Sequence, residues 1–238
     1  YSREILAPMV EAAHAKGVRV VAHADSPEHA LLAARAGVDA LVHSIHLGEL
    51  TAEQARELKA LGVVVSPTID VYNRISEMAA FTYAPTALER ELYPADYLAQ
   101  FSPEVVRRQT LSDGMMEWLA ALQKDGAHRS PSVKRMYDEG IPLFAGSDAA
   151  GSAACWAGGS LIDELGLMVK AGIPPEEVLL SATVRPARWL APSGDWGMVA
   201  VGARADLIVI DGDPVADITA MARVREVLKA GVRLEKLA

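Results

Sequence analysis

Short apolar runs alternate along this chain with helical patterns, and this alternation limits the fold more than any other feature. The runs occupy residues 18–22, 40–42, 63–65 and 141–145, and a helical pattern precedes each one. Runs of this length are typical of buried parallel strands, because parallel neighbours need a crossover connection that is usually a helix. The sequence therefore predicts an α/β protein in which four strands of a parallel sheet alternate with helices.

Residues able to bind a metal ion stand where three of these strands end. The first strand ends at His23, the second at His43, and the fourth leads into Asp148. In a (β/α) barrel the chemistry takes place at the carboxyl ends of the strands, so these side chains are expected to converge. Neutral imidazole and carboxylate are common ligands of zinc, and a carboxylate also accepts protons. We predict a metal site formed by His23, His43 and Asp148; a hydrogen-bonded structural histidine is the alternative for either ring alone.

A long insertion separates the third and fourth strands. It covers residues 70–128, about sixty residues, whereas most connections in compact domains have only a few. Its helical patterns are rich in aromatic side chains, although aromatic residues make up only 5% of the chain. The insertion is either an accessory helical hairpin or a lid over the active-site mouth. Tyr72, at its start, is a candidate to bind substrate by donating to a developing oxyanion, or else it is a packing residue.

The last part of the chain changes to a β pattern. Short strands are predicted at residues 198–200, 207–210 and 224–228, separated by glycine-containing turns. We therefore divide the chain into a catalytic domain over residues 1–193 and a small β appendage over residues 194–238.

Composition excludes several classes of function. The 238 residues carry a net charge of −8, so neither a nucleic acid nor an anionic membrane surface is an expected partner. No apolar stretch reaches the length of a membrane span. Cys155 is the only cysteine, which suits a reducing compartment and favours the cytoplasm. Because the chain does not start with methionine, an exported form with an upstream signal stays open.

Five segments resemble the later half of the amidohydrolase superfamily, most closely its imidazolonepropionase-like and Xaa-Pro dipeptidase-like branch. They are the segments at residues 21–24, 36–44, 145–148, 183–187 and 202–214. The resemblance implies the C-terminal half of a (β/α)8 TIM barrel, strands 5–8, with the C-terminal part of a flanking β-sandwich. It also implies one or two divalent ions, Zn²⁺ or another metal. His23 would be the fifth-strand ligand, His43 the sixth-strand ligand, and Asp148 both a ligand and the general base and acid.

The chain also departs from the family pattern. The His-x-His pair of the first strand and the carboxylated lysine of the fourth have no counterpart, so we expect a fragment that is inactive alone and whose partner is the missing N-terminal half of the barrel. Where the family commonly has Glu-His-Gly, this chain has Val42, His43 and Ser44. His46 is an alternative ligand, and Asp25 is a substitute if the fragment prediction fails.

The residue at position 26, a serine, bears on which type of reaction is expected. Deaminases and imidazolonepropionases of the superfamily tend to carry a glutamate at this position, three residues after the fifth-strand histidine. The resemblance therefore favours metal-assisted hydrolysis of a C–N bond in a small amide or dipeptide. A ring deaminase or cyclic amide hydrolase is one alternative, and an inactive or non-catalytic binding barrel is another. A second copy of the chain is a further candidate partner.

Overall fold

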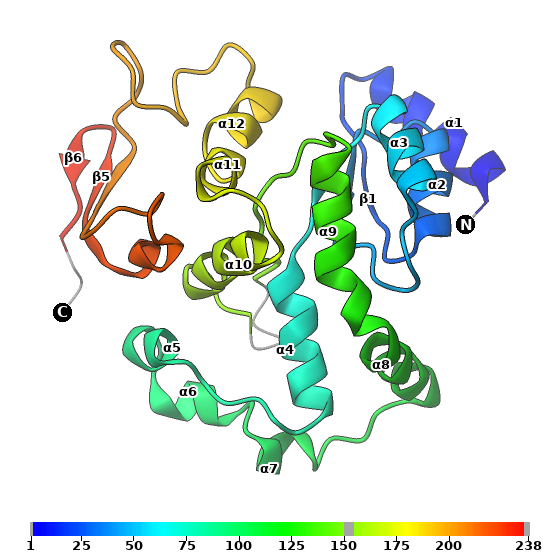
Figure 1. The fold of residues 1–238 in the computed structure, drawn as a ribbon, viewed down its shortest axis with the longest axis horizontal. Coiled ribbons are helices and arrows are strands. Elements are labelled where there is room, and N and C mark those ends of the chain that lie inside the picture. Colours follow the sequence, from blue (N-terminus) through cyan, green and yellow to red (C-terminus); the bar gives the residue numbers. More distant parts are fainter. Residues whose placement is uncertain (1, 150–154, 236–238) are drawn as a thin grey trace.

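The computed structural model describes residues 2–149 and 155–235 and begins with a regular α/β repeat. Its elements are α1 (Arg3–His14), β1 (Val21–His23), α2 (Pro27–Arg35), β2 (Ala40–Val42), α3 (Ala52–Ala60) and β3 (Val64–Ser66). The three strands form a parallel sheet in the order β1-β2-β3. Figure 1 shows α1, α2 and α3 clustered together at the N-terminal side of the molecule. The predicted alternation of strands and helices is thus confirmed for this part of the chain.

Side chains at the helix starts explain where these helices begin. The Ser26 hydroxyl accepts a hydrogen bond from the His29 backbone before α2. At α3, Thr51 and Gln54 bond reciprocally to each other's backbone N–H groups and form a capping box. These bonds satisfy donors that the first turn of a helix leaves without partners, so each helix starts at a defined residue.

The fourth predicted strand is reduced to a single bridge. Leu143 pairs in parallel with Val65, and no regular strand forms elsewhere in residues 141–145. Two causes are visible in the backbone. Pro142 has no N–H to donate, and the chain then turns away, since the Ala145 N–H donates to the Ser181 carbonyl at 3.0 Å. The described residues therefore form an open sheet of three strands plus this bridge rather than a closed barrel.

One apolar core joins this sheet to the helices that follow. It includes Leu41, Val65 and Leu143 on the sheet side, with Leu58, Met136 and Leu165 from the helices. Those helices include α9 (Arg129–Asp138) and α10 (Gly159–Lys170). The sheet and its covering helices therefore provide a rigid base for the strand ends.

The predicted insertion is helical. It contains α4 (Ile69–Ala79), α5 (Ala87–Leu92), α6 (Ala95–Ala99), α7 (Pro103–Val106), α8 (Asp113–Asp125) and the short 3-10 helix η1 (Gly126–His128). Figure 1 shows α5, α6 and α7 following one another along an edge of the molecule; in the chain they lie between the long helices α4 and α8.

The C-terminal part contains two further helices and a separate small sheet. After α11 (Pro175–Ser181) and α12 (Val184–Leu190) come β4 (Leu207–Ile210), η2 (Ile218–Ala222), β5 (Val224–Lys229) and β6 (Val232–Arg233). The antiparallel order is β4-β5-β6. The predicted strand at 198–200 is wrong. Val199 is fully exposed, and glycines with positive φ, Gly197 and Gly202, flank the segment, so it has neither a buried face nor an extended backbone on both sides.

No described helix is both long enough and apolar enough to cross a membrane.

Candidate active site

Parallel pairing brings the two strand-end histidines together. His23 is opposite Val42 in the β1–β2 register, and His43 follows Val42 directly. The His43 Nε2 atom lies 2.6 Å from the His23 Nδ1 atom, and the ring centroids are 4.6 Å apart. The convergence of these two rings, predicted from their places at neighbouring strand ends, is confirmed. His23 is exposed, whereas His43 is buried, so the pair stands at the edge of the core with one ring open to solvent.

A threonine after the next strand holds the buried ring. The His43 Nδ1 atom lies 2.8 Å from the Thr68 hydroxyl oxygen, a hydrogen-bond distance in a buried environment. This contact sets the orientation of the imidazole and leaves Nε2 directed at His23. Metal-binding histidines are commonly oriented in this way through their other ring nitrogen. Thr68 was not among the residues identified from the sequence, where a threonine just before a helix indicates only an N-cap.

Burial keeps the His43 imidazole neutral. Desolvation, and then the neighbouring His23, lower the pKa of His43 from 6.5 to about 4. The negative charge of Asp148 opposes part of this decrease, so the carboxylate is near enough to act on the ring. Asp148 itself is exposed and follows the bridge residue Leu143 by five positions. A neutral imidazole has the lone pair that metal binding requires.

The backbone is unusual at this rim. Five described residues other than glycine have positive φ, and three of them follow strand ends: His43 at 81°, Thr68 at 44° and Asp148 at 52°. Such conformations cost about 1–3 kcal/mol each and cluster at functional sites. Each turns the chain sharply where its strand, or in the last case the bridge, has ended.

Tyr72 and His46 lie beside the pair. The Tyr72 ring centroid is 5.2 Å from that of His43 and 4.3 Å from that of His46. His46 is fully buried and its Nδ1 donates to the Ser44 carbonyl at 2.6 Å, which leaves Nε2 as an acceptor. Among the described residues this Nε2 has no hydrogen-bond partner. The structure thus brings Tyr72 next to both histidines, where the sequence placed it only near the mouth.

The insertion contacts the segment that follows Asp148. Trp156, which is buried, packs against three aromatic rings of the insertion, Tyr93, Tyr97 and Phe101, with centroids 4.7–5.5 Å away. Cys155 joins Tyr72 in a second apolar cluster. These contacts attach the insertion at the same side of the sheet as the strand ends.

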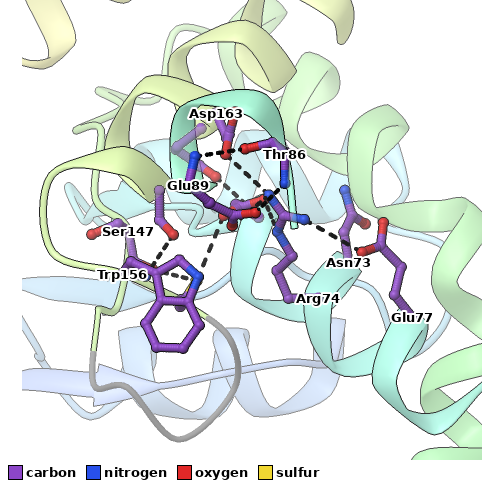
Figure 2. Close-up of polar contacts among 12 residues, drawn as sticks. Asn73, Arg74, Glu77, Thr86, Glu89, Ser147, Trp156 and Asp163 are labelled. Atoms are coloured by element: carbon purple, nitrogen blue, oxygen red, sulfur yellow. Dashed lines mark hydrogen bonds and ion pairs between the residues drawn. The ribbon is translucent and has the colours of Figure 1, made fainter. Parts of the chain in front are cut away.

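An arginine network holds the insertion to the body of the protein. Figure 2 shows Arg74 among several acidic side chains. Its guanidinium lies 3.0 Å from Asp163 of α10, 3.1 Å from Glu89 of α5 and 3.3 Å from Asp70 of α4. Burial raises the pKa of Asp70 to about 6, although Arg74 counteracts this. A cleft of about 470 Å³ opens beside the network, and His23, His43 and Asp148 are not among its lining residues.

The donor set for a metal is incomplete in the described part of the chain. No group of three or more His, Cys, Asp or Glu side chains there is arranged to hold an ion. The two facing histidine nitrogens are 2.6 Å apart. Two imidazoles on one tetrahedral zinc, with bonds near 2.0–2.1 Å, would place their nitrogens about 3.3 Å apart. The oriented imidazole pair therefore fits a share of a metal site, provided that the rings separate slightly and further ligands are added.

The chain is similar to known proteins of one family. A family model described as the amidohydrolase family matches residues 1–234. A solved Xaa-Pro dipeptidase with bound methionine is 26% identical with a TM-score of 0.74, and the match covers 99% of this chain and 49% of the other. A prolidase complexed with N-methylphosphonate-L-proline is 25% identical with a TM-score of 0.70, covering 100% and 50%. None of the curated protein sequences compared with the chain matches it.

More distant structures show the same fold. Ochratoxinase from A. niger is 22% identical with a TM-score of 0.67, and the match covers 97% of this chain and 45% of that one. The chain thus spans about half the length of the solved structures it matches. This share agrees with the open, partial sheet described above.

Proposed function

Because the chain belongs to the amidohydrolase family, we propose that it forms part of a metal-dependent amidohydrolase and supplies His23, His43 and Asp148 to the catalytic centre. The family match also confirms the resemblance seen in the sequence. The observation that carries the proposal is the contact between His23 and His43 at adjacent strand ends, with the second ring oriented by Thr68. On this proposal the three strands and the Leu143 bridge are strands 5–8 of a barrel.

Each proposed role follows from a position at the rim. A divalent ion such as Zn²⁺ would supply a Lewis acid that polarises the scissile carbonyl and acidifies water. His23 and His43 would hold it through neutral ring nitrogens. Asp148, exposed at the same rim, would take the proton of the attacking water and return it to the leaving nitrogen. Tyr72 would donate a hydrogen bond from its hydroxyl to the developing oxyanion.

The proposed substrates are small amides or dipeptides. Two of the most similar solved structures are a Xaa-Pro dipeptidase and a prolidase, so Xaa-Pro dipeptides are the first compounds to test. The insertion is proposed as a wall or lid over the rim, because its aromatic rings pack on Trp156 just beyond Asp148. It would exclude bulk water from the reacting groups.

The test uses the longest natural form of the protein. We expect it to contain one or two equivalents of divalent metal and to hydrolyse Xaa-Pro dipeptides, with activity lost on chelation and restored by Zn²⁺ or another divalent ion. His43→Ala and Asp148→Asn should each reduce kcat/KM by at least about a thousandfold, or roughly 4 kcal/mol in transition-state free energy. His14→Ala is the matched control, because His14 is exposed and pairs with Asp39 at the opposite end of the strands. A metal-free protein of wild-type fold without hydrolase activity would instead support the non-catalytic alternative.

A further inference from the structure

The helix that follows the third strand begins in an unusual way. Thr68 is the N-cap residue of α4, and threonine at this position normally accepts a hydrogen bond from the first turn. Here its side chain makes no such bond within the described chain. The hydroxyl is instead 2.8 Å from His43 Nδ1. The backbone N–H groups at the start of α4 therefore need another acceptor.

Glu164 of α10 provides that acceptor. Its Oε2 atom accepts a hydrogen bond from the Asp70 backbone N–H at 2.8 Å. Glu164 is fully buried and is separated from Asp70 by 94 positions in the sequence. The acceptor for this helix start thus comes from a different element rather than from the local sequence.

The buried location of Glu164 disfavours the ionised form of its carboxyl group. Its second oxygen, Oε1, has no hydrogen-bond partner in the described part of the chain. Burial raises the pKa of Glu164 to about 8, so the carboxyl group is mostly neutral at pH 7. An apolar residue would avoid the free-energy cost of burying an acid, but it would leave the Asp70 N–H without its acceptor.

The contact between α4 and α10 continues along both helices. One turn after Asp70, Arg74 bonds to Asp163, the neighbour of Glu164, at 3.0 Å. Figure 2 shows Arg74 and Asp163 in this contact. The first turns of α4 are therefore fixed on α10, and α4 places both Thr68 and Tyr72 beside His43.

We propose that Glu164 is a positioning residue for the active site: it caps α4 in place of Thr68, so that the Thr68 hydroxyl is free to orient His43. This inference rests on the proposed function of His43 and extends it to a residue that contacts neither metal nor substrate. Without Glu164, the Asp70 N–H would lack an acceptor and would compete with His43 for the Thr68 hydroxyl, so we expect that hydroxyl to turn back to the helix. His43 would then lose its partner and its fixed orientation.

The first experiment observes His43 directly in the 238-residue chain. Two-bond ¹H–¹⁵N spectra report the tautomer and hydrogen bonding of each imidazole. Thr68→Val should shift the His43 signals, and Glu164→Met should shift them in the same direction. Glu164→Gln, which keeps an acceptor of the same shape, should leave them unchanged. If Glu164→Met does not fold, Glu164→Asp, whose carboxyl group is one methylene shorter, replaces it with the same expectation.

Glu89→Gln and Glu89→Met are the matched controls. Glu89 is also a fully buried acid beside Arg74, but it caps α5 through Thr86. These variants should leave the His43 signals in place even where they lower stability. A folded Glu164→Met or Glu164→Asp protein with wild-type His43 signals would overturn the inference. So would an equal His43 shift in the Glu89 variants.

The second experiment measures catalysis in the longest natural form. Glu164→Met should lower kcat by about 10- to 100-fold with little change in KM, and Glu164→Gln should restore most of it. The two proposals fail separately. Loss of activity in His43→Ala with no His43 shift in Glu164→Met would overturn only the positioning role. The expected shift in a protein that never binds metal or hydrolyses substrate would overturn only the proposed function.

Discussion

At the scale of single residues, the site depends on polar groups that orient neighbouring histidine rings. The Thr68 side chain does not cap the helix it precedes and lies against His43. The Ser44 carbonyl binds the His46 Nδ1–H and so selects one tautomer of that ring. Each of these two contacts fixes the orientation of a ring beside the strand ends. This pattern is typical of functional sites, where local rules give way to a required geometry.

Tyr72 allows a test at this scale. Tyr72→Phe keeps the ring that contacts His43 and His46 but removes the hydroxyl. If the hydroxyl stabilises an oxyanion, kcat of the longest natural form should fall by about a hundredfold or more while the free energy of unfolding changes by less than about 1 kcal/mol. Steady-state kinetics and urea unfolding of the same preparation measure both. Unchanged kcat would show that Tyr72 is only a packing residue.

The raised pKa of Glu164 predicts a pH effect on stability. Between the ordinary value of 4.5 and the folded value of about 8, the folded state keeps a proton that the unfolded state has released. The free energy of unfolding therefore decreases as pH rises through this window, by up to about 1.4 kcal/mol per unit from this group. Glu164→Gln has no such proton, so its stability relative to wild type should increase from pH 5 to pH 8. Urea unfolding at four pH values measures this difference, and the same comparison in an Asp70→Asn background removes the coupled titration of Asp70. A difference that does not vary with pH would contradict the prediction.

At the scale of elements, the third strand and the loop before Asp148 are in close contact at Gly146. A Cβ atom added to Gly146 would overlap the Ser66 hydroxyl, which belongs to the last residue of β3. Gly146→Ala should therefore destabilise the fold by about 1–3 kcal/mol and displace the Asp148 loop. Adding Ser66→Ala removes the overlapping oxygen and should recover most of the loss, so the two changes are coupled. Thermal unfolding of the single and double variants measures the coupling. Purely additive effects would show that this contact does not limit the loop.

The elements that the sequence predicts well are those defined by local patterns. The helices after Ser26 and Thr51 start at side-chain caps, and the strands ending at His23 and His43 are short apolar runs between helices. The two misjudged strands depend on partners. The run at 141–145 has apolar residues, but Pro142 and the turn at Ala145 leave it one bridge. The run at 198–200 has no partner strand among the described residues.

In the candidate site, too, some residues could be predicted from local patterns and others could not. Its histidines were predictable because strand ends of a parallel sheet share one edge. The role of Glu164 was not predictable from the sequence. It depends on a contact with a residue 94 positions away and on a threonine that does not make the usual N-cap hydrogen bond. The i,i+4 spacing on α4 links Arg74 to Asp70, but no local pattern links it to Glu89 of α5 or Asp163 of α10. Such contacts are set by how helices pack, which one sequence without its structure does not specify.

At the scale of the whole molecule, the parallel sheet has open edges. β1 is the outer strand on one side, and Val18 and Val21 near it are about half exposed. The other side ends in the single bridge at Leu143. Exposed apolar strand edges are sites for pairing with further strands. Such pairing would also bring additional strand ends, and so additional ligands, to the rim that holds His23 and His43.

This arrangement predicts how the 238-residue chain binds metal by itself. Two facing imidazoles and one exposed carboxylate are fewer donors than the four of a usual tetrahedral zinc site. Isothermal titration calorimetry with zinc should therefore give a Kd at least about a hundredfold higher for this chain than for the longest natural form. This corresponds to a difference in binding free energy near 2.7 kcal/mol. Hydrolysis of Xaa-Pro dipeptides by the chain alone should be negligible, because a loosely held ion does not fix the position of water. His23→Ala and His43→Ala should abolish the weak binding, and His14→Ala should not. Tight zinc binding by the chain alone would contradict this and would direct attention to His46 and Asp25 as substitute ligands, His46 because its buried Nε2 already lacks a partner in the described structure.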